Sequence, residues 1–300
     1  MSVAPLRLLL LAHAFNGLTQ RLFVALRDAG HVSSVELDIA DAVTEEAVAA
    51  FAPDLVIAPF LKRRLPESVW SVRPCLVVHP GPPGDRGPAA LDWAVLDGER
   101  DWGVTVLQAT ADFDAGPVWA WQPCTLRAHA SKGSLYRHEV TQAAAQAVRA
   151  ALARVQPGSA QPLPAELHPL PTPRGWRPLV TRAERAIDWA QHDADVVLQR
   201  VRSADGFPGV AGSLFGQPCT LFDAHPASAE VTARAQDAMP GAAVARRGPA
   251  VLLRCATGAV WIGHVRRDGA LKRPAAEAFD EAAALPDWPA WPSNRKPYHT

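Results

Sequence analysis

A short apolar run passes into a glycine- and proline-rich loop at Leu76-Val77-Val78-His79-Pro80-Gly81-Pro82-Pro83-Gly84-Asp85-Arg86-Gly87. An apolar run of this length, bounded by turn residues, is typical of a buried strand. The loop is too rich in glycine and proline to form regular structure, and such a loop exposes backbone N–H groups to an approaching ligand. The junction therefore predicts a buried strand that ends in a functional loop, with His79 at the boundary.

Similar apolar runs recur on both sides of this junction and alternate with segments of helical pattern. The predicted strands cover residues 6–12, 32–37, 55–58, 76–78, 104–109 and 118–121, and the predicted helices cover 17–29, 44–51, 88–96 and 134–155. This alternation indicates an α/β fold, a Rossmann-like parallel sheet covered on both faces. Ligands bind such sheets at the carboxyl ends of strands, which places Asn16-Gly17, Pro59-Phe60-Leu61 and His79-Pro80 at candidate active-site ends.

A second, smaller domain is expected after a proline-rich linker at residues 156–178. Thr181-Arg182-Ala183-Glu184 fits a capping box, and Asp193 is expected to cap a helix that ends at Ala204. Short strands then follow, separated by turns at Phe215-Gly216, Arg247-Gly248 and Thr257-Gly258. This pattern predicts a small antiparallel β-barrel over residues 179–273. Residues 274–300 lack periodicity and are expected to form an irregular tail.

Composition excludes several classes of function. Thirty basic and thirty acidic residues cancel, so no net field draws the chain to nucleic acid or to a membrane. The apolar run at residues 6–12 is too short for a membrane span or a typical signal peptide, so a cytoplasmic protein is expected. The four cysteines lack the close spacing of zinc ligands, so no metal site is expected.

Two residues have the properties of a catalytic pair. Histidine acts as a general acid or as an electrostatic stabiliser near neutral pH, although His79 taken alone fits a structural role as well. Asp114 lies in the turn Asp112-Phe113-Asp114-Ala115-Gly116-Pro117, within an otherwise apolar stretch. It either forms a local Asx-turn or reaches the His79 ring and holds its tautomer.

This arrangement resembles the formyltransferase family, which includes methionyl-tRNA and glycinamide ribonucleotide formyltransferases. That family shares Asn-x-His-x-Ser-Leu-Leu-Pro, then Arg-Gly, then a Leu-Asp-x-Gly turn. His79, Arg86-Gly87 and Asp114 match these elements, whereas Val77 stands in place of the asparagine. Ala186-Ile187-Asp188-Trp189 and Phe207-Pro208-Gly209 resemble the family's C-terminal domain. The resemblance implies a folate-binding catalytic domain over residues 1–155 and an OB-like barrel over 179–273.

Further runs resemble one branch of this family, the N-terminal half of hydrogenase maturation proteins HypX or HoxX. They are Ala14 to Arg21, Ala58 to Lys62, His79 to Gly81, Gly84 to Pro88 and Ser203 to Gly206. The implied reaction moves a formyl group from 10-formyltetrahydrofolate to the thiol of coenzyme A. In that branch a crotonase-like domain follows, and it is thought to release carbon monoxide for the iron of a nickel–iron hydrogenase. The tail does not resemble it, so this sequence is either an excised or split half, or a chain whose second activity is supplied separately; the candidate partners are then a separate crotonase-like protein or hydrogenase maturation factors.

The resemblance also implies roles for individual residues. Folate would lie along the strand ends, with its pterin against the backbone of Pro59, Phe60, Leu61 and Lys62. Protonated His79 would stabilise the oxyanion while Asp114 keeps the ring charged and relays a proton. Arg86 would either bind a phosphate or the folate carboxylate, or brace its loop. Asn16 would either replace the missing asparagine as a donor or hold a turn.

Val77 bears on the identity of the formyl acceptor. The family's asparagine donates to the oxyanion, and loss of one such donor costs about 3–4 kcal/mol. A thiol ionises far more readily than a neutral amine loses its proton, so a thiol acceptor demands less of the site. Three alternatives remain open: formyl transfer to an amine, hydrolysis of the formyl donor, and a non-catalytic folate-binding module in hydrogenase assembly.

Overall fold

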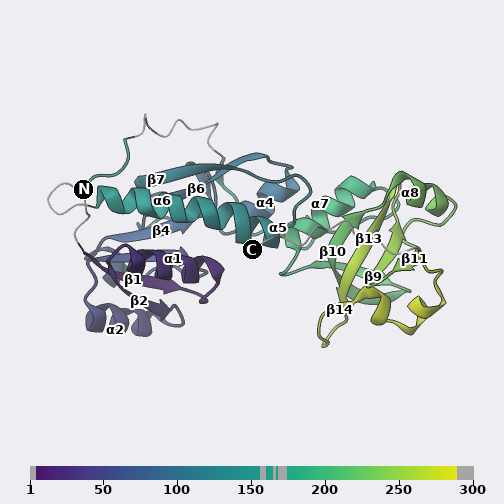
Figure 1. Cartoon of the computed structure of the whole chain (residues 1–300), viewed down its shortest axis with the longest axis horizontal. Coiled ribbons are helices and arrows are strands. Elements are labelled where there is room, and N and C mark those ends of the chain that lie inside the picture. Colours follow the sequence, from purple (N-terminus) through teal and green to yellow (C-terminus); the bar gives the residue numbers. More distant parts are fainter. Residues whose placement is uncertain (1–4, 156–159, 165–166, 168–173, 289–300) are drawn as a thin grey trace. The chain divides into compact units, whose positions relative to one another are not determined.

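The computed structural model describes residues 5–155, 160–164, 167 and 174–288. The chain forms two compact units, which are described separately (Figure 1). The first comprises Met1–Ala128 and Ser134–Leu179, and the second comprises His129–Gly133 and Val180–Thr300. The predicted order, a Rossmann-like α/β domain followed by an antiparallel β domain, is confirmed.

The first unit is built on a six-stranded mixed sheet of order β2-β1-β3-β4-β6-β7. The strands are β1 (Arg7–Ala12), β2 (Val32–Leu37), β3 (Leu55–Phe60), β4 (Cys75–His79), β6 (Asp101–Gln108) and β7 (Val118–Thr125). The four strands from β2 to β4 are parallel, whereas β6 runs antiparallel to β4 and β7 antiparallel to β6. Because β2 and β3 flank β1 on opposite sides, the topological switch point lies at the carboxyl ends of β1 and β3.

Helices cover both faces of this sheet. The long helix α6 (Thr141–Arg154) packs on β6 and β7 and contacts α1 (Gly17–Asp28), as Figure 1 shows. On the other face, α2 (Asp41–Phe51) and α3 (Glu67–Trp70) bury Val48 and Val69 against alternate residues of β1 and β3. A further helix, α4 (Ala90–Leu96), follows the glycine- and proline-rich loop.

The single helix predicted over residues 134–155 is instead interrupted. It consists of α5 (Lys132–Leu135), a π-helical turn at Tyr136–Val140, and α6. The Thr141 hydroxyl donates to the Tyr136 carbonyl at 2.7 Å, five residues back, and so closes the wide turn. π-Turns inside helices often lie at functional sites.

The end of the predicted linker belongs to the first unit. Strand β8 (Gly175–Trp176) pairs in parallel with β5 (Asp85–Arg86), in the loop that follows His79. The Gly175 amide donates to the Gly84 carbonyl at 3.0 Å, and the Arg177 amide donates to the Arg86 carbonyl at 2.9 Å. Residues 174–177 are therefore attached to the candidate catalytic loop, contrary to the linker prediction; residues 156–159, 165–166 and 168–173 lie outside the described ones.

The second unit contains an antiparallel sheet of order β11-β12-β13-β10-β9, with β14 paired to β13. Its elements are α7 (Ala194–Ala204), β9 (Val210–Leu214), β10 (Gln217–Pro226), α8 (Ala229–Ala235), β11 (Ala243–Arg247), β12 (Ala250–Arg254), β13 (Ala259–Arg266) and β14 (Arg273–Pro274). As predicted, the Asp193 side chain caps α7 by accepting from the Val196 amide at 2.9 Å. The predicted hairpin turn is also present, with positive φ at Phe215 and Gly216.

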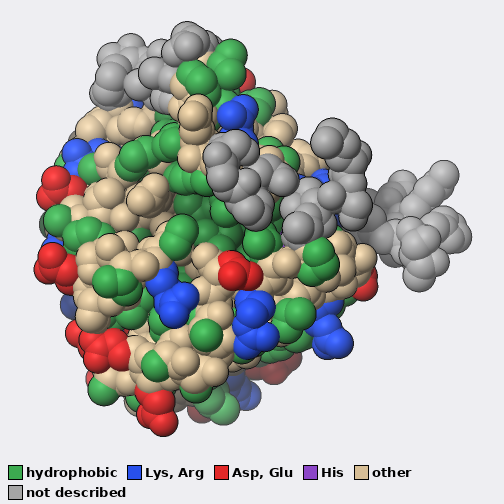
Figure 2. All heavy atoms as spheres, turned by 90° about the vertical axis from the view of Figure 1, so that its left-hand side faces the viewer, with side chains coloured by type: hydrophobic (Ala, Val, Ile, Leu, Met, Phe, Trp, Pro, Cys, Tyr) green, Lys and Arg blue, Asp and Glu red, His purple; other side chains and the backbone are tan. Residues whose placement is uncertain are grey.

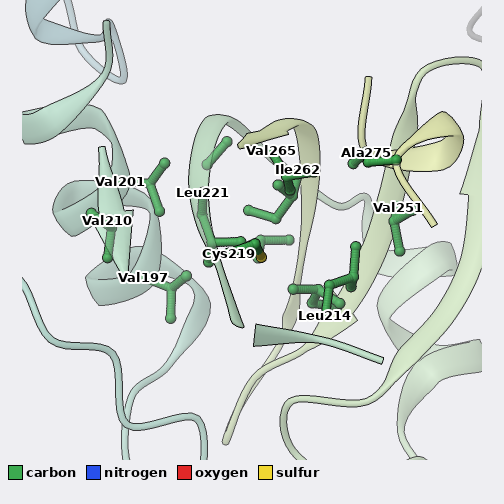
Figure 3. Close-up of a cluster of buried hydrophobic side chains, with 14 of the residues drawn as sticks. Val197, Val201, Val210, Leu214, Cys219, Leu221, Val251, Ile262, Val265 and Ala275 are labelled. Carbon is green, nitrogen blue, oxygen red and sulfur yellow. The ribbon is translucent and has the colours of Figure 1, made fainter. Parts of the chain in front are cut away.

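The core of the second unit lies between α7 and the sheet. Figure 3 shows apolar side chains from α7, β9, β10, β12 and β13 that point toward one another. Ala275, Ala278, Phe279 and Ala282 are buried in the same core. The irregular tail predicted from residue 274 is therefore wrong for 274–284, which include 3-10 helices at Ala275–Glu277 and Asp280–Ala284. Short 3-10 turns do not give the repeating apolar pattern by which longer elements are recognised.

The capping box predicted at the start of the second unit is present as a pair of hydrogen bonds. Thr181 and Glu184 form both hydrogen bonds of a capping box, at 2.6 and 3.2 Å, but these close a turn rather than begin a helix.

On the face drawn in Figure 2, acidic and basic side chains are interspersed among the described residues, in keeping with the zero net charge. Among the residues described, no helix is both long and apolar enough to cross a membrane.

Candidate active site

His79 is held between two carboxylates. It is the last residue of β4, and the side chain is buried. Its Nε2 lies 2.7 Å from Asp85 Oδ2, a hydrogen-bond distance. Its Nδ1 lies 3.5 Å from Asp114 Oδ1, which is ion-pair range but long for a hydrogen bond. The predicted approach of Asp114 to the His79 ring is therefore present, and a second acid, Asp85, lies closer still.

Asp114 reaches this position from the turn between β6 and β7. Its φ is +51°, a left-handed conformation that aspartate tolerates better than most residues. Its Oδ2 accepts a hydrogen bond from the Gly87 amide at 3.0 Å, which ties the turn to the catalytic loop. The carboxylate therefore bonds across 27 residues, rather than forming the local Asx-turn of the alternative interpretation.

The loop after His79 is held by buried hydrogen bonds to β6. The Thr105 hydroxyl donates to the Gly81 carbonyl at 2.7 Å, and the Trp102 indole donates to the Pro80 carbonyl at 2.9 Å. Gly81 must be glycine, because a Cβ there would lie 2.6 Å from His79 Nε2. These contacts fix the position of the loop relative to the ring.

A cavity of about 190 Å³ opens beside the pair. Both carboxylate partners of His79 line it, together with Arg86. The remaining lining residues come from the loop that follows His79, from β6, from the turn that carries Asp114 and from the start of β7: Pro82, Pro83, Gly84, Thr105, Leu107, Ala115, Gly116 and Val118. The cavity is smaller than the roughly 300–1,000 Å³ of ordinary ligand pockets, so it suits the reacting end of a larger molecule.

Arg86 braces its loop. Its Nε donates to the Phe113 carbonyl at 3.2 Å, in the turn that carries Asp114. The Phe113 ring in turn contacts the Arg64 guanidinium, 4.5 Å from the ring centroid, and the Trp176 ring at 6.2 Å. Two roles were predicted for Arg86, and its hydrogen bond to Phe113 supports the one in which it braces the loop. The residue also lines the cavity.

The other predicted residues form a separate group at the switch point. Asn16 is the N-cap of α1: its Oδ1 accepts from the Thr19 amide at 3.0 Å, and its Nδ2 is 3.4 Å from the Tyr136 hydroxyl. Phe60 packs edge-on against Tyr136, with ring centroids 6.0 Å apart. Burial raises the pKa of Tyr136 to about 12, so the phenol keeps its proton. Asn16 follows β1, whereas His79 ends β4, and β3 lies between these two strands. The contacts of Asn16 therefore give it the role of holding a turn.

The backbone predicted to hold the pterin lies at the end of β3. Pro59 is buried, Leu61 is half-buried and Lys62 is exposed. The Phe60 carbonyl already accepts a hydrogen bond from the His13 amide at 2.7 Å. One of the two lone pairs of the Phe60 carbonyl is therefore used within the protein.

Two residues of the site were missed in the sequence. Asp85 stands in a loop of glycine and proline, where a carboxylate is ordinarily exposed, yet it is only 2% exposed. Thr105 is a polar residue within an apolar strand and is fully buried. For Thr105 the available signal was a polar residue between two apolar ones, Val104 and Val106, because a buried polar group requires a partner. Asp85, between Gly84 and Arg86, carries no such signal.

Both units of the chain are similar to known proteins. Residues 32–152 match the family described as formyl transferase, and residues 179–282 match the formyl transferase C-terminal domain. The chain is 52% identical, over 95% of its length, to hydrogenase maturation factor HoxX of Bradyrhizobium diazoefficiens, of which it covers 49%. It is 25% identical, over 95% of its length, to methionyl-tRNA formyltransferase of Ralstonia pickettii, of which it covers 84%.

A solved structure gives a similar result. The crystal structure of HypX from Aquifex aeolicus in complex with tetrahydrofolic acid matches 99% of this chain and 50% of that one, with a TM-score of 0.87 and 38% identity. The chain thus spans about half the length of the HoxX and HypX proteins that it matches. Together with the two matched domains, these similarities show that the chain belongs to the formyltransferase family.

Proposed function

We propose that this chain transfers a formyl group from 10-formyltetrahydrofolate to a thiol, that of coenzyme A, in the cytoplasm. The observation that carries the proposal is the His79 ring held between Asp85 and Asp114, beside a small cavity lined by both carboxylates. The product, formyl-CoA, would be the first intermediate in making the carbon monoxide ligand of a nickel–iron hydrogenase. A crotonase-like activity or another maturation factor would consume it.

The reaction moves one formyl group and one proton. The thiol sulfur attacks the formyl carbon, an S–C bond forms, and the C–N10 bond of the folate breaks. The thiol proton passes to N10 by way of His79, and Asp114 stabilises the ring while it is charged. In its charged form His79 also offsets the negative charge on the formyl oxygen of the tetrahedral intermediate. The products are formyl-CoA and tetrahydrofolate.

Two observations support an external thiol as acceptor. Burial raises the pKa of Cys75 and Cys255 to about 12, and that of Cys124 and Cys219 to about 11. None of these thiols is activated as a nucleophile, so a thiol acceptor would have to come from a second substrate. Val77, in place of the family's asparagine, packs against the core beside Cys75 and supplies no donor for an amine-acceptor mechanism.

The relatives support the donor and the biological setting. The HypX structure is a complex with tetrahydrofolic acid, which supports a folate co-substrate. HoxX is a hydrogenase maturation factor, which supports a maturation role. We place the reacting end of the folate in the cavity beside Asp114, and the rest of the molecule along the ends of β3 and β4, near residues 59–62.

The test is to incubate the chain with 10-formyltetrahydrofolate and coenzyme A and to measure formyl-CoA, formate and tetrahydrofolate by mass spectrometry. Formyl-CoA formed in step with tetrahydrofolate is the expected result. Formate without formyl-CoA would instead indicate hydrolysis of the donor, and a formylated amine in a parallel incubation would indicate an amine acceptor.

The variant His79→Ala separates catalysis from binding. It is expected to bind tetrahydrofolate and to lose formyl transfer by roughly 10²-fold or more, as removal of a general acid–base commonly does. Asp112→Asn is the matched control, because this exposed acid lies two residues from Asp114. A full transfer rate in His79→Ala would contradict the catalytic assignment, and folate binding by the wild type without turnover would favour a binding module.

A further inference from the structure

The two carboxylates beside His79 are not equivalent. Asp85 is 2% exposed, and its Oδ2 is 2.7 Å from Nε2 of the ring. The Asp114 side chain is 13% exposed, and its Oδ1 is 3.5 Å from Nδ1. One ring nitrogen therefore has a short hydrogen bond to a buried acid, whereas the other faces a more accessible acid at a distance that leaves room for change.

The short bond is held by the structure around it. The Asp85 amide donates to the Pro82 carbonyl at 3.0 Å, which closes the loop into a turn. Asp85 and Arg86 then pair with Gly175 and Trp176 as a short parallel ladder. Gly81 permits the approach of acid and ring, because a Cβ there would lie 2.4 Å from Asp85 Oδ2. Two backbone contacts and the absence of a Cβ at Gly81 thus hold this carboxylate against Nε2.

The chemistry of the imidazole ring determines which nitrogen of His79 carries the proton. A neutral imidazole carries one N–H and one lone pair, and an ionised carboxylate accepts but does not donate. A fixed carboxylate at Nε2 therefore keeps the proton on Nε2 and leaves the lone pair on Nδ1. A proton taken up at Nδ1 would then face Asp114, whose other oxygen is already occupied by the Gly87 amide.

We infer that Asp85 is a positioning residue that fixes the tautomer of His79 and makes Nδ1 the nitrogen that exchanges the proton during formyl transfer. This inference rests on the proposed function for its catalytic part. The acceptor thiol loses its proton to Nδ1, the charged ring is stabilised by Asp114 on one side and Asp85 on the other, and the proton then leaves Nδ1 for N10 of the folate. Asp85 lines the cavity, but it acts through the ring, because its Oδ2 is engaged at Nε2.

The first measurement is on the wild-type chain and requires no turnover. In protein with ¹⁵N-labelled histidine, the ring nitrogens of His79 are identified by comparison with His79→Gln. At a pH where the ring is neutral, we expect a protonated Nε2 and a bare Nδ1. A proton on Nδ1 with Nε2 bare would overturn the inference, whether or not the chain makes formyl-CoA.

The second measurement uses Asp85→Asn, which keeps the size of the side chain. We expect the tautomers of His79 to become mixed or reversed, because the amide offers a donor as well as an acceptor to Nε2. The turnover number should fall by roughly 10²-fold or more, while the KM for each substrate stays near the wild-type value. Asp112→Asn should leave both the spectrum and the rate unchanged.

The results distinguish the two proposals. If the wild type makes no formyl-CoA but carries the Nε2 proton, and Asp85→Asn shifts it, the assigned reaction is wrong and the positioning role stands. If the wild type makes formyl-CoA and Asp85→Asn keeps both tautomer and rate, the reaction stands and the positioning role is wrong. Should Asp85→Asn fail to fold, the wild-type spectrum still decides which nitrogen carries the proton.

Discussion

Thr105 lies directly opposite His79 in the antiparallel pairing of β4 with β6, and its hydroxyl donates a hydrogen bond to the Gly81 carbonyl at 2.7 Å. The strand that neighbours His79 thus also holds the first turn of the loop beyond it. Because Thr105 is fully buried, the Gly81 carbonyl has little access to water in its place. The ladder and this side chain together fix the point where the loop leaves the sheet.

The first prediction follows for Thr105→Val, which keeps the shape of the side chain and removes its donor. We expect a loss of about 1–3 kcal/mol in the free energy of unfolding, because a buried carbonyl is left unpaired. The rate of formyl transfer should fall as well, since the loop that carries Asp85 is released. Urea unfolding and product formation measure the two effects. Thr105→Ser keeps the hydroxyl, and a loss of rate equal to that of the valine variant would show that the hydrogen bond is not the cause.

The second prediction concerns Gly81→Ala. The added methyl group would meet Asp85 Oδ2 and His79 Nε2 at distances that no real Cβ tolerates, so ring and acid must separate. We expect destabilisation of about 1–3 kcal/mol from overpacking and a marked drop in turnover. Gly17→Ala is the control for stability, because a methyl group added there would meet nothing within 4 Å and alanine favours a helix. Wild-type turnover in Gly81→Ala would contradict the proposed contact between Asp85 and His79.

Much of this fold and part of this site are readable in the sequence, for physical reasons. The strands are short apolar or alternating runs bounded by turn residues, and β2 has the bounds that its alternation predicts. Asp193 is recognisable as a helix cap because a cap depends only on residues three positions apart. His79 and Asp114 can be paired because buried polar groups require partners and the family resemblance links them.

The remaining features depend on contacts between distant segments. Asp85 acts on His79 through a tight loop whose conformation is set by Gly81 and by pairing with residues 175–176, far along the chain. Residues 175–176 show no alternation of apolar and polar residues that would predict a strand, because a strand of two residues is too short to have one. The contact of Asn16 with Tyr136 likewise joins residues 120 positions apart.

The third prediction tests whether residues 174–177 support the catalytic loop. Arg177 pairs with Asp97 and lies over the Trp93 ring, 4.0 Å from its centroid, which anchors β8 beside β5. We expect Arg177→Ala to lower stability by only about 1 kcal/mol, yet to lower turnover clearly and to speed hydrogen exchange at the Arg177 amide. The matched control is Arg234→Ala, which removes an ion pair to Glu230 and a contact with Trp288 in the second unit. Equal effects of both variants on turnover would contradict a specific role for the β8 pairing.

The fourth prediction concerns acid stability in the second unit. Asp223 accepts hydrogen bonds from His225 Nε2 at 2.8 Å and from His264 Nδ1 at 3.1 Å. The hydrogen bond from His225 is the largest cause. Together with the hydrogen bond and the charge of His264, it lowers the pKa of Asp223 from 3.8 to about 2. A carboxyl with a lowered folded-state pKa stabilises the folded chain above its unfolded value and loses that contribution as the pH falls through the folded value. We therefore expect the stability advantage of the wild type over Asp223→Asn to be fully present at about pH 5 and to shrink between about pH 4 and pH 2. Because these side chains are partly exposed, the advantage should be below about 1 kcal/mol.

Urea unfolding at a series of pH values measures this advantage, with the exposed Asp237→Asn as the control variant. If the curves of wild type and Asp223→Asn stay parallel down to pH 2, the two histidines do not stabilise this carboxylate.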